Sequence, residues 1–143
     1  MHPPAAESRL HEAGLRATRP RLAVYAHLRE AGGHHSVDDI ARRLAKAGEP
    51  LPRQTVYNVV ADLTAAGLLM CADAGPGRAL YEAAEEWHHH FVCRRCATII
   101  DVPCTRGRKP CLDAPAGLGL QIDEAQVIFR GLCPACRGEP DAA

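Results

Sequence analysis

The 143-residue sequence predicts an α+β fold, with a helical N-terminal half and a small C-terminal half of short strands. Apolar residues recur at helical spacing up to Gly67, and beyond it the spacing changes to that of strands. Two Cys-x-x-Cys pairs fall in the second half. We therefore expect two domains, residues 1–82 and 88–143, with residues 83–87 as a hinge.

The first two helices are expected on either side of a short turn. Residues 7–14 (ESRLHEAG) predict a short helix that ends at a glycine. Thr18 can cap the second helix, with Pro20 in its first turn, and the Gly32-Gly33 pair ends it. The apolar face of this helix consists of Leu22, Tyr25 and Leu28.

Two further helices are expected before Gly67. Ser36 can cap the third, and Asp39, three residues on, completes a variant capping box. The fourth runs from Arg53 to the glycine. Their apolar faces are Val37, Ile40 and Leu44 for the third, and Val56, Val59 or Val60, and Leu63 for the fourth.

A β-hairpin is expected after the fourth helix, because LLMCA and RALYE flank the turn sequence DAGPG. Helices followed by a hairpin are the element order of a winged helix, although any small helical domain with a hairpin fits the same pattern. In a winged helix, the helix at about residues 53–66 would enter the DNA major groove. The hairpin tip near residues 75–77 would approach the DNA backbone.

The C-terminal half predicts four strands and one short helix. The strands are expected at residues 88–92, 97–102, 118–123 and 127–132, separated by segments rich in Pro and Gly. The short helix is expected between Lys109 and Ala116.

The composition indicates a cytoplasmic protein. No apolar run approaches the roughly 18 residues of a membrane span, and the N-terminus lacks the apolar core of a signal peptide. Net charge is zero, and only the first 53 residues, with nine basic and six acidic side chains, weakly favour a nucleic-acid partner. Seven cysteines in such a chain favour metal or redox chemistry over structural disulfides.

The two cysteine pairs predict a structural zinc site. Cys93-Arg-Arg-Cys96 and Cys133-Pro-Ala-Cys136 are separated by 36 residues. Each pair suits a tight knuckle, and two knuckles complete a tetrahedral site of four cysteines. The C-terminal half is short and has few aromatic residues, so it makes a poor apolar core. Structural zinc can contribute on the order of 10 kcal/mol to its folding. A thioredoxin-like use of either pair would need a βαβ context, which this sequence lacks.

The histidines beside the first pair suggest a second metal site. In a strand, His88 and His90 point to one face, and a His-x-His pair next to a carboxylate suits a metal that takes nitrogen and oxygen ligands. The alternative is a solvated histidine-rich strand. The candidates to complete the site are Glu82, Asp101 and one of His34 and His35.

The segments GLRATRPR, GGHHSVDDI, RQTVYNVVADLTAAGLL, LYE, HHHFVCRRC and GLCPAC follow one another between about residues 8 and 137. In this order they resemble the ferric uptake regulator (Fur) superfamily of dimeric, metal-dependent bacterial repressors. The resemblance implies a winged-helix DNA-binding domain at residues 1–82. It also implies a dimerisation and metal-binding domain, a small α/β domain, at residues 88–143.

The resemblance also implies two metal sites. A regulatory ligand set of three histidines and two carboxylates favours Fe²⁺ or Mn²⁺, and Zn²⁺ or Ni²⁺ can substitute in vitro. The family's second regulatory site is incomplete, since only His89 and Glu124 remain as fragments. The matching residues are Cys93, Cys96, Cys133 and Cys136 for structural zinc, and His34, Glu82, His88, His90 and Asp101 for the regulatory metal.

By the same resemblance, the partner is a double-stranded DNA operator, an AT-rich inverted repeat bound by a homodimer. Metal binding would hold the two domains at the angle that DNA binding needs. Tyr57 and Asn58 match the family's base-reading pair. The expected phosphate contacts are Arg16, Arg19, Arg21 and Arg53.

Within the superfamily, Asp101 and the VYN sequence resemble peroxide-sensing (PerR-like) members, which use Fe²⁺ to oxidise their own histidine ligands. Glu82 departs from that pattern, because aspartate is usual there. The C-terminal tail looks more like the regulators found beside catalase-peroxidase genes of high-GC bacteria (CatR- or FurA-like). We therefore expect a peroxide-responsive repressor of oxidative-stress (catalase) or iron genes, with a sensor of iron or zinc level as the alternative.

Other readings concern the remaining cysteines and a different class of protein. Cys104 and Cys111 are either a redox pair or two ordinary thiols, and Cys71 is expected to be a small buried apolar residue. A metal-dependent hydrolase or a zinc-stabilised interaction module would also use these ligands. We expect no enzyme, because the sequence offers neither a Gly-rich substrate loop nor a general base beyond the ligands.

Overall fold

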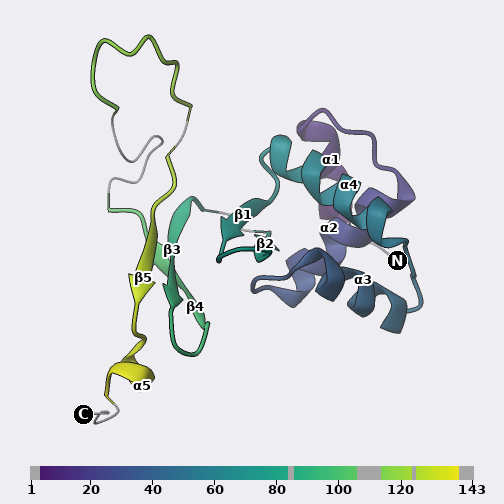
Figure 1. The fold of residues 1–143 in the computed structure, drawn as a ribbon. Coiled ribbons are helices and arrows are strands. Elements are labelled where there is room, and N and C mark those ends of the chain that lie inside the picture. Colours follow the sequence, from purple (N-terminus) through teal and green to yellow (C-terminus); the bar gives the residue numbers. More distant parts are fainter. Residues whose placement is uncertain (1–3, 84–85, 106–113, 124, 139–143) are drawn as a thin grey trace. The chain divides into compact units, whose positions relative to one another are not determined.

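The computed structural model describes residues 4–83, 86–105, 114–123 and 125–138 (Figure 1). The chain forms two compact units, residues 1–85 and 86–143, called here the N-terminal unit and the C-terminal unit. The boundary between them falls within residues 83–87, the predicted hinge. Each unit is described by itself.

The N-terminal unit begins with four helices, and two of them, the second and the third, have the N-terminal caps that the sequence predicts. The Thr18 hydroxyl accepts a hydrogen bond from the Arg21 amide at 3.4 Å. Ser36 and Asp39 form the predicted capping box. The helices are α1 (Pro4–Glu12), α2 (Arg19–Ala31), α3 (Val37–Lys46) and α4 (Arg53–Ala65).

No helix of the described residues is long and apolar enough to cross a membrane.

One apolar core joins these helices. It contains the predicted faces of α3 and α4, with both Val59 and Val60 buried. Of the predicted α2 face, Tyr25 and Leu28 are buried in the core, and Leu22 is partly buried against it. The largest side chains with almost no exposed surface include Leu10, Tyr25 and Leu63. Burying apolar surface of this kind contributes about 25 cal/mol per Å², so this core is the main source of stability of the N-terminal unit.

A two-stranded antiparallel hairpin, β1 (Met70–Asp73) and β2 (Ala79–Glu82), completes the N-terminal unit. The turn between them contains Gly75 and Gly77, both at positive φ. The order of helices and hairpin confirms the predicted winged-helix arrangement.

The C-terminal unit contains a three-stranded sheet in the order β4-β3-β5. Strand β3 pairs with β4 antiparallel and with β5 parallel. A four-residue helix follows the sheet; Cys133 of the second cysteine pair is its N-cap residue, and Cys136 lies within it. The elements are β3 (His88–Cys93), β4 (Ile99–Pro103), β5 (Ile128–Gly131) and α5 (Pro134–Arg137).

The strand predicted at residues 118–123 is wrong, because that segment is irregular. Gly117 and Gly119 have φ values of 90° and 69°, which an extended strand does not allow. The apolar alternation that suggested a strand is present, but its side chains are exposed. The helix predicted between Lys109 and Ala116 falls largely outside the described residues, and residues 114–116 are not helical.

Candidate metal centres and DNA-recognition face

The four zinc-ligand cysteines form one cluster in the C-terminal unit. Cys93 ends β3, and its Sγ accepts hydrogen bonds from the amides of Cys96 at 3.5 Å and Cys133 at 3.4 Å. Ala97, at a φ of 65°, closes the first knuckle. Cys133 is the N-cap residue of α5, so the second pair spans the first turn of that helix.

The spacing of the sulfurs fits zinc. The Sγ atoms of Cys96 and Cys133 are 3.7 Å apart, and all four Sγ atoms lie within 4.8 Å of one another. Zinc–sulfur bonds of about 2.3 Å place the sulfurs of a tetrahedral site about 3.8 Å apart. The chain therefore contains a zinc site formed by four cysteines.

Backbone amides prepare these thiols for metal binding. The hydrogen bond from the Cys96 amide, followed by that from the Cys133 amide, lowers the pKa of Cys93 to about 6. Burial and the neighbouring sulfurs raise the pKa of Cys136. A cation at the centre favours the thiolate form of all four, since the thiolate is the form that ligates metals.

Three further ligand candidates meet on the β3–β4 pair. His90 lies opposite Asp101 in the strand register. The Asp101 Oδ1 is 3.3 Å from His88 Nε2 and 3.8 Å from His90 Nε2. His88 Nδ1 lies 3.0 Å from the Glu86 carbonyl, so an N–H at Nδ1 leaves Nε2 as the metal-binding nitrogen.

The N-terminal unit holds the other two candidates as a pair. His34 Nε2 lies 3.1 Å from Glu82 Oε2, and both side chains are largely buried. The backbone of His35 bridges to Tyr81 through two hydrogen bonds, which anchors the α2–α3 loop to β2. The ring of His35 contacts the Gly32 carbonyl instead of a carboxylate. Of the two adjacent histidines, His34 is the one paired with an acidic residue.

The described residues give little support to a second regulatory metal site, for which the sequence retains only His89 and Glu124. His89 is buried, and its Nδ1 accepts a hydrogen bond from the Val127 amide at 3.1 Å. Burial lowers the pKa of His89, which keeps the ring neutral. Its other fragment, Glu124, lies outside the described residues.

The base-reading candidates lie on the exposed face of α4. The Tyr57 side chain is half exposed. Gln54 Nε2 donates a hydrogen bond to Asn58 Oδ1 at 3.0 Å, which orients the Asn58 amide. A polar pair and an aromatic ring on one helix face offer donors, acceptors and apolar surface to base edges.

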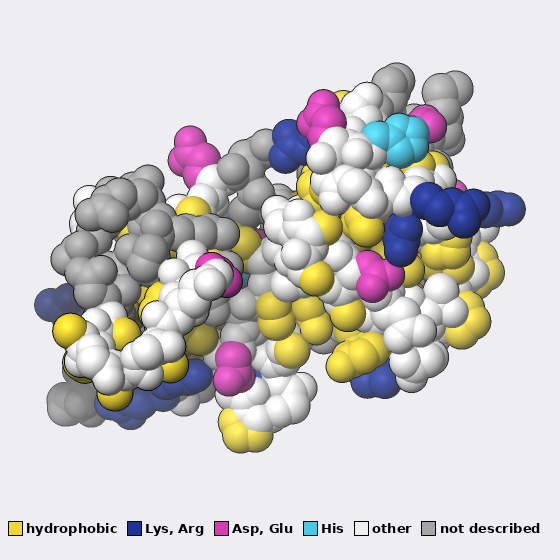
Figure 2. Space-filling model, turned by 90° about the horizontal axis from the view of Figure 1, so that it is seen from above, with side chains coloured by type: hydrophobic (Ala, Val, Ile, Leu, Met, Phe, Trp, Pro, Cys, Tyr) yellow, Lys and Arg dark blue, Asp and Glu magenta, His cyan; other side chains and the backbone are white. Residues whose placement is uncertain are grey.

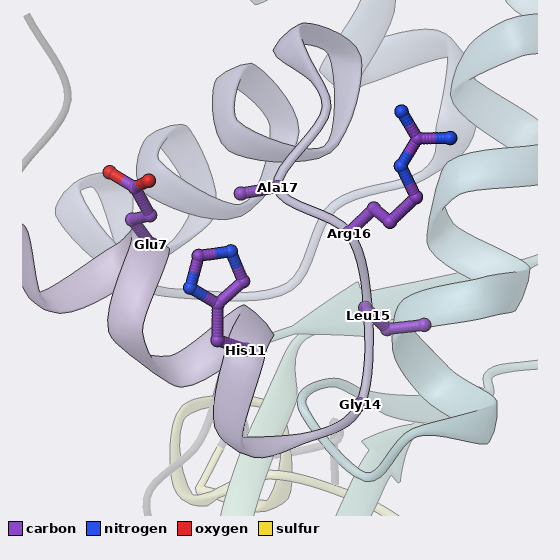
Figure 3. A pocket seen from close by; sticks show the side chains of 6 residues that line it. All are labelled: Glu7, His11, Gly14, Leu15, Arg16 and Ala17. Atoms are coloured by element: carbon purple, nitrogen blue, oxygen red, sulfur yellow. The ribbon is translucent and has the colours of Figure 1, made fainter.

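The four candidate phosphate contacts have different surroundings. Arg16 and Arg19 are exposed, and Figure 3 shows the Arg16 guanidinium directed away from Glu7 and His11, beside a hollow of about 390 Å³. Arg21 donates to Asp62 at 3.1 Å and to the Arg16 carbonyl at 3.0 Å. The fourth, Arg53, is hydrogen-bonded to an aspartate of α3.

Sequence reasoning missed Arg78, which follows the hairpin turn and shares a cleft with Arg53 and Tyr57. Its position directly after Gly-Pro-Gly was the available signal. On the face drawn in Figure 2, Lys and Arg side chains of the described residues form small separate groups among acidic ones. This pattern agrees with the zero net charge.

Among the described residues, Cys71 and Cys104 are not part of a disulfide. Cys104 lines a cavity of about 600 Å³ together with Trp87, His88 and Asp101. Cys111, its candidate redox partner, lies outside the described residues. Cys71 is only partly buried and packs against the apolar core, so the prediction of a buried residue holds in part. Burial raises the pKa of its thiol.

Residues 12–128 match the family described as "Ferric uptake regulator family". Transcriptional regulator FurA of Mycobacterium tuberculosis is 43% identical over 128 residues, which cover 89% of this chain and 86% of that protein. Ferric uptake regulation protein 1 of Mycolicibacterium fortuitum is 43% identical over 121 residues, which cover 84% of this chain and 74% of that protein.

The fold is also similar to that of a solved structure, the ferric uptake regulator from Pseudomonas aeruginosa with manganese. The sequences are 26% identical, the TM-score is 0.69, and the match covers 90% of this chain and 98% of that one.

Proposed function

Because the chain belongs to the ferric uptake regulator family and is therefore a metal-dependent transcriptional regulator, we propose that it is a cytoplasmic, homodimeric repressor that binds its operator only when a regulatory metal is bound. The observation that carries this proposal is the presence of two incomplete ligand groups. One is the His34–Glu82 pair, and the other is the trio of His88, His90 and Asp101. Neither group alone supplies the four to six ligands that a divalent transition metal takes.

We propose that one ion draws ligands from both groups. Three imidazoles and two carboxylates suit Fe²⁺ or Mn²⁺, and Zn²⁺ or Ni²⁺ can substitute in vitro. A similar protein of known structure, the Pseudomonas aeruginosa regulator, was solved with manganese.

The repressing effect then follows from differential binding. An ion that needs ligands from both units stabilises only those arrangements in which the two ligand groups meet. In a dimer this selects the spacing at which two α4 helices enter successive major-groove faces of an inverted repeat. Loss of the ion releases that constraint, and operator affinity falls.

The homodimer is supported by the surface of the C-terminal unit. Five of the six exposed large hydrophobic residues of the described chain belong to this unit. Two of them, Ile100 and Phe129, flank Phe91 across the sheet in register, which makes an apolar row. Strand β5 is also an edge strand. We propose that a second copy of the chain covers this row.

We further propose that peroxide is the signal. Peroxide oxidises a ligand histidine by placing one of its oxygen atoms in an imidazole C–H bond, while the other oxygen leaves as water. Bound Fe²⁺ supplies the redox chemistry, and the oxidised ring is a poorer ligand. The resemblance at Asp101 to peroxide-sensing members favours this signal.

A sensor of iron level is the second candidate. It is favoured by the 43% identity to a protein named a ferric uptake regulation protein. In that case the ligands bind and release the ion reversibly, and no covalent change follows.

Peptide mass mapping after dilute peroxide separates the two candidates. The protein is loaded with zinc and then with Fe²⁺ or, in parallel, with Mn²⁺. We expect one added oxygen on the peptide containing His34 or His88, in the iron form alone. Absence of oxygen in both forms, combined with iron-dependent operator binding, would replace peroxide sensing by iron sensing. A disulfide between Cys104 and Cys111 in both forms would move the sensing to thiols.

A further inference from the structure

A cleft of about 300 Å³ separates the N-terminal ends of α3 and α4 from the β1–β2 hairpin, within the N-terminal unit. Its lining includes two acidic residues, Asp38 and Asp73, and two basic residues, Arg53 and Arg78. The charges of these four side chains cancel. This balance is unexpected on a face that meets DNA phosphates, because each carboxylate there opposes association.

One of the acidic residues directly restrains a predicted DNA contact. The Arg53 Nε donates a hydrogen bond to Asp38 Oδ1 at 2.6 Å, and both side chains are about two-thirds exposed. Asp38 is the second residue of α3, and its backbone is held in place by the capping box of Ser36 and Asp39. Arg53 is the first residue of α4, so the pair links the recognition helix to α3.

The contact leaves Arg53 able to bind a phosphate in a fixed direction. An arginine side chain has five N–H donors, and Asp38 engages the one on Nε. The four N–H groups on the terminal nitrogens remain available for other acceptors. The Arg53–Asp38 pair has no net charge. It therefore attracts distant phosphates weakly, and its approach releases few counterions from the DNA.

We propose that Asp38 is a specificity-determining residue that restrains Arg53. On random DNA, Asp38 cancels the attraction that Arg53 would otherwise exert. On the operator, base contacts from α4 seat the helix, and the oriented terminal N–H groups of Arg53 reach a phosphate. This inference rests on the proposed DNA-binding function, and the two are tested by different readouts.

The test compares the full-length, zinc- and Mn²⁺-loaded protein with its Asp38→Asn variant. Two probes are used: a duplex selected by the wild-type protein from a random library, and a duplex of random sequence. We expect Asp38→Asn to bind the random duplex about 3- to 10-fold more tightly, with a salt slope steeper by about one to two for the dimer. Affinity for the selected duplex should rise less, so discrimination falls.

Two further variants isolate the cause. Adding Arg53→Ala to Asp38→Asn should cancel the gain on the random duplex. Glu30→Gln removes one exposed negative charge outside the cleft and should leave discrimination unchanged. Zinc content and far-ultraviolet circular dichroism confirm that each variant is folded.

Unchanged discrimination in Asp38→Asn would overturn the inference, and so would a parallel loss of affinity for both duplexes. A gain that persists without Arg53 would also overturn it, because the restraint would then act elsewhere. A wild-type protein that selects no sequence in any metal form would instead overturn the proposed function, and this inference with it.

Discussion

His34 and His35 are neighbours in the sequence, yet their rings have different partners. His34 lies against Glu82, whereas His35 contacts the Gly32 carbonyl. Residue type and spacing allowed either to be a ligand. The partner was decided by the bridge that pins the His35 backbone to β2.

At the residue scale, we expect His34→Ala or His88→Ala to abolish the metal dependence of operator binding, because each removes an imidazole from the proposed regulatory site. The loss should be at least about 10-fold in Mn²⁺-dependent affinity, while the zinc content stays at wild type. Titration of a labelled operator with and without Mn²⁺ measures this effect. His11→Ala, on the exposed side of α1, is the control. Full metal dependence in both ligand variants would refute the proposed five-ligand site.

Replacement of a zinc ligand should change the zinc content and the oligomeric state, which the histidine variants leave intact. Cys96→Ser or Cys133→Ser should lose zinc and the dimer together, because the metal contributes folding energy to the C-terminal unit. Metal analysis and size-exclusion chromatography check this outcome, with Cys71→Ser as the matched control outside the cluster. Folded, dimeric, zinc-free variants would show that the cluster has no structural role.

At the scale of single elements, helix α3 owes its start to a reciprocal capping box. Ser36→Ala should lower the free energy of unfolding by about 1 kcal/mol at neutral pH, because an α3 amide loses its acceptor. Chemical denaturation of the zinc-loaded protein measures the difference. A change within error would mean that solvent satisfies the helix end equally well.

The acidic member of the box adds a pH dependence. The hydrogen bond from Arg42, followed by the Ser36 amide, lowers the pKa of Asp39 below its usual 3.8. A lowered pKa stabilises the folded state above about pH 4, and this stabilisation is lost as the pH falls through the folded-state value. The stability difference between wild type and Asp39→Asn should therefore shrink below about pH 4. A difference that stays constant under strongly acidic conditions would exclude the carboxylate as its source.

A substitution in strand β5 tests the proposed dimer interface. Phe129 is 47% exposed beside Phe91, so Phe129→Glu should place a charge in the proposed apolar interface. We expect a monomer by analytical ultracentrifugation and weaker operator binding, with zinc content unchanged. A stable dimer in this variant would place the interface on another surface.

At the scale of the whole molecule, the proposed mechanism couples two separately folded units through one ion. Addition of Mn²⁺ should narrow the distribution of particle dimensions measured by small-angle scattering of the zinc-loaded dimer. His34→Ala keeps the three ligands of the C-terminal unit, so it should bind the ion more weakly and show no narrowing. An equal response in both proteins would mean that metal acts within the C-terminal unit alone.

Local signals in the sequence determined much of this architecture. Caps, glycines and 3.6-residue periodicity act within a few residues, and for that reason they predicted α2, α3, α4 and the hairpin. The two Cys-x-x-Cys pairs also predicted their zinc site. The geometry of each knuckle depends only on neighbouring residues, whereas the approach of the two knuckles depends on the tertiary structure.

The tertiary structure decided what depends on distant partners. The pairing of β3 with β4 sets Asp101 opposite His90, and the α2–α3 loop sets His34 beside Glu82. Residues 118–123 alternate apolar and other side chains but form no β-strand. Glycines at positive φ and the lack of a partner strand among the described residues prevent it, and the alternation alone could not show this. The sequence likewise could not show that Arg21 and Arg53 are engaged by Asp62 and Asp38. Side-chain identity restricts which contacts are allowed, whereas the packing of elements determines which of them form.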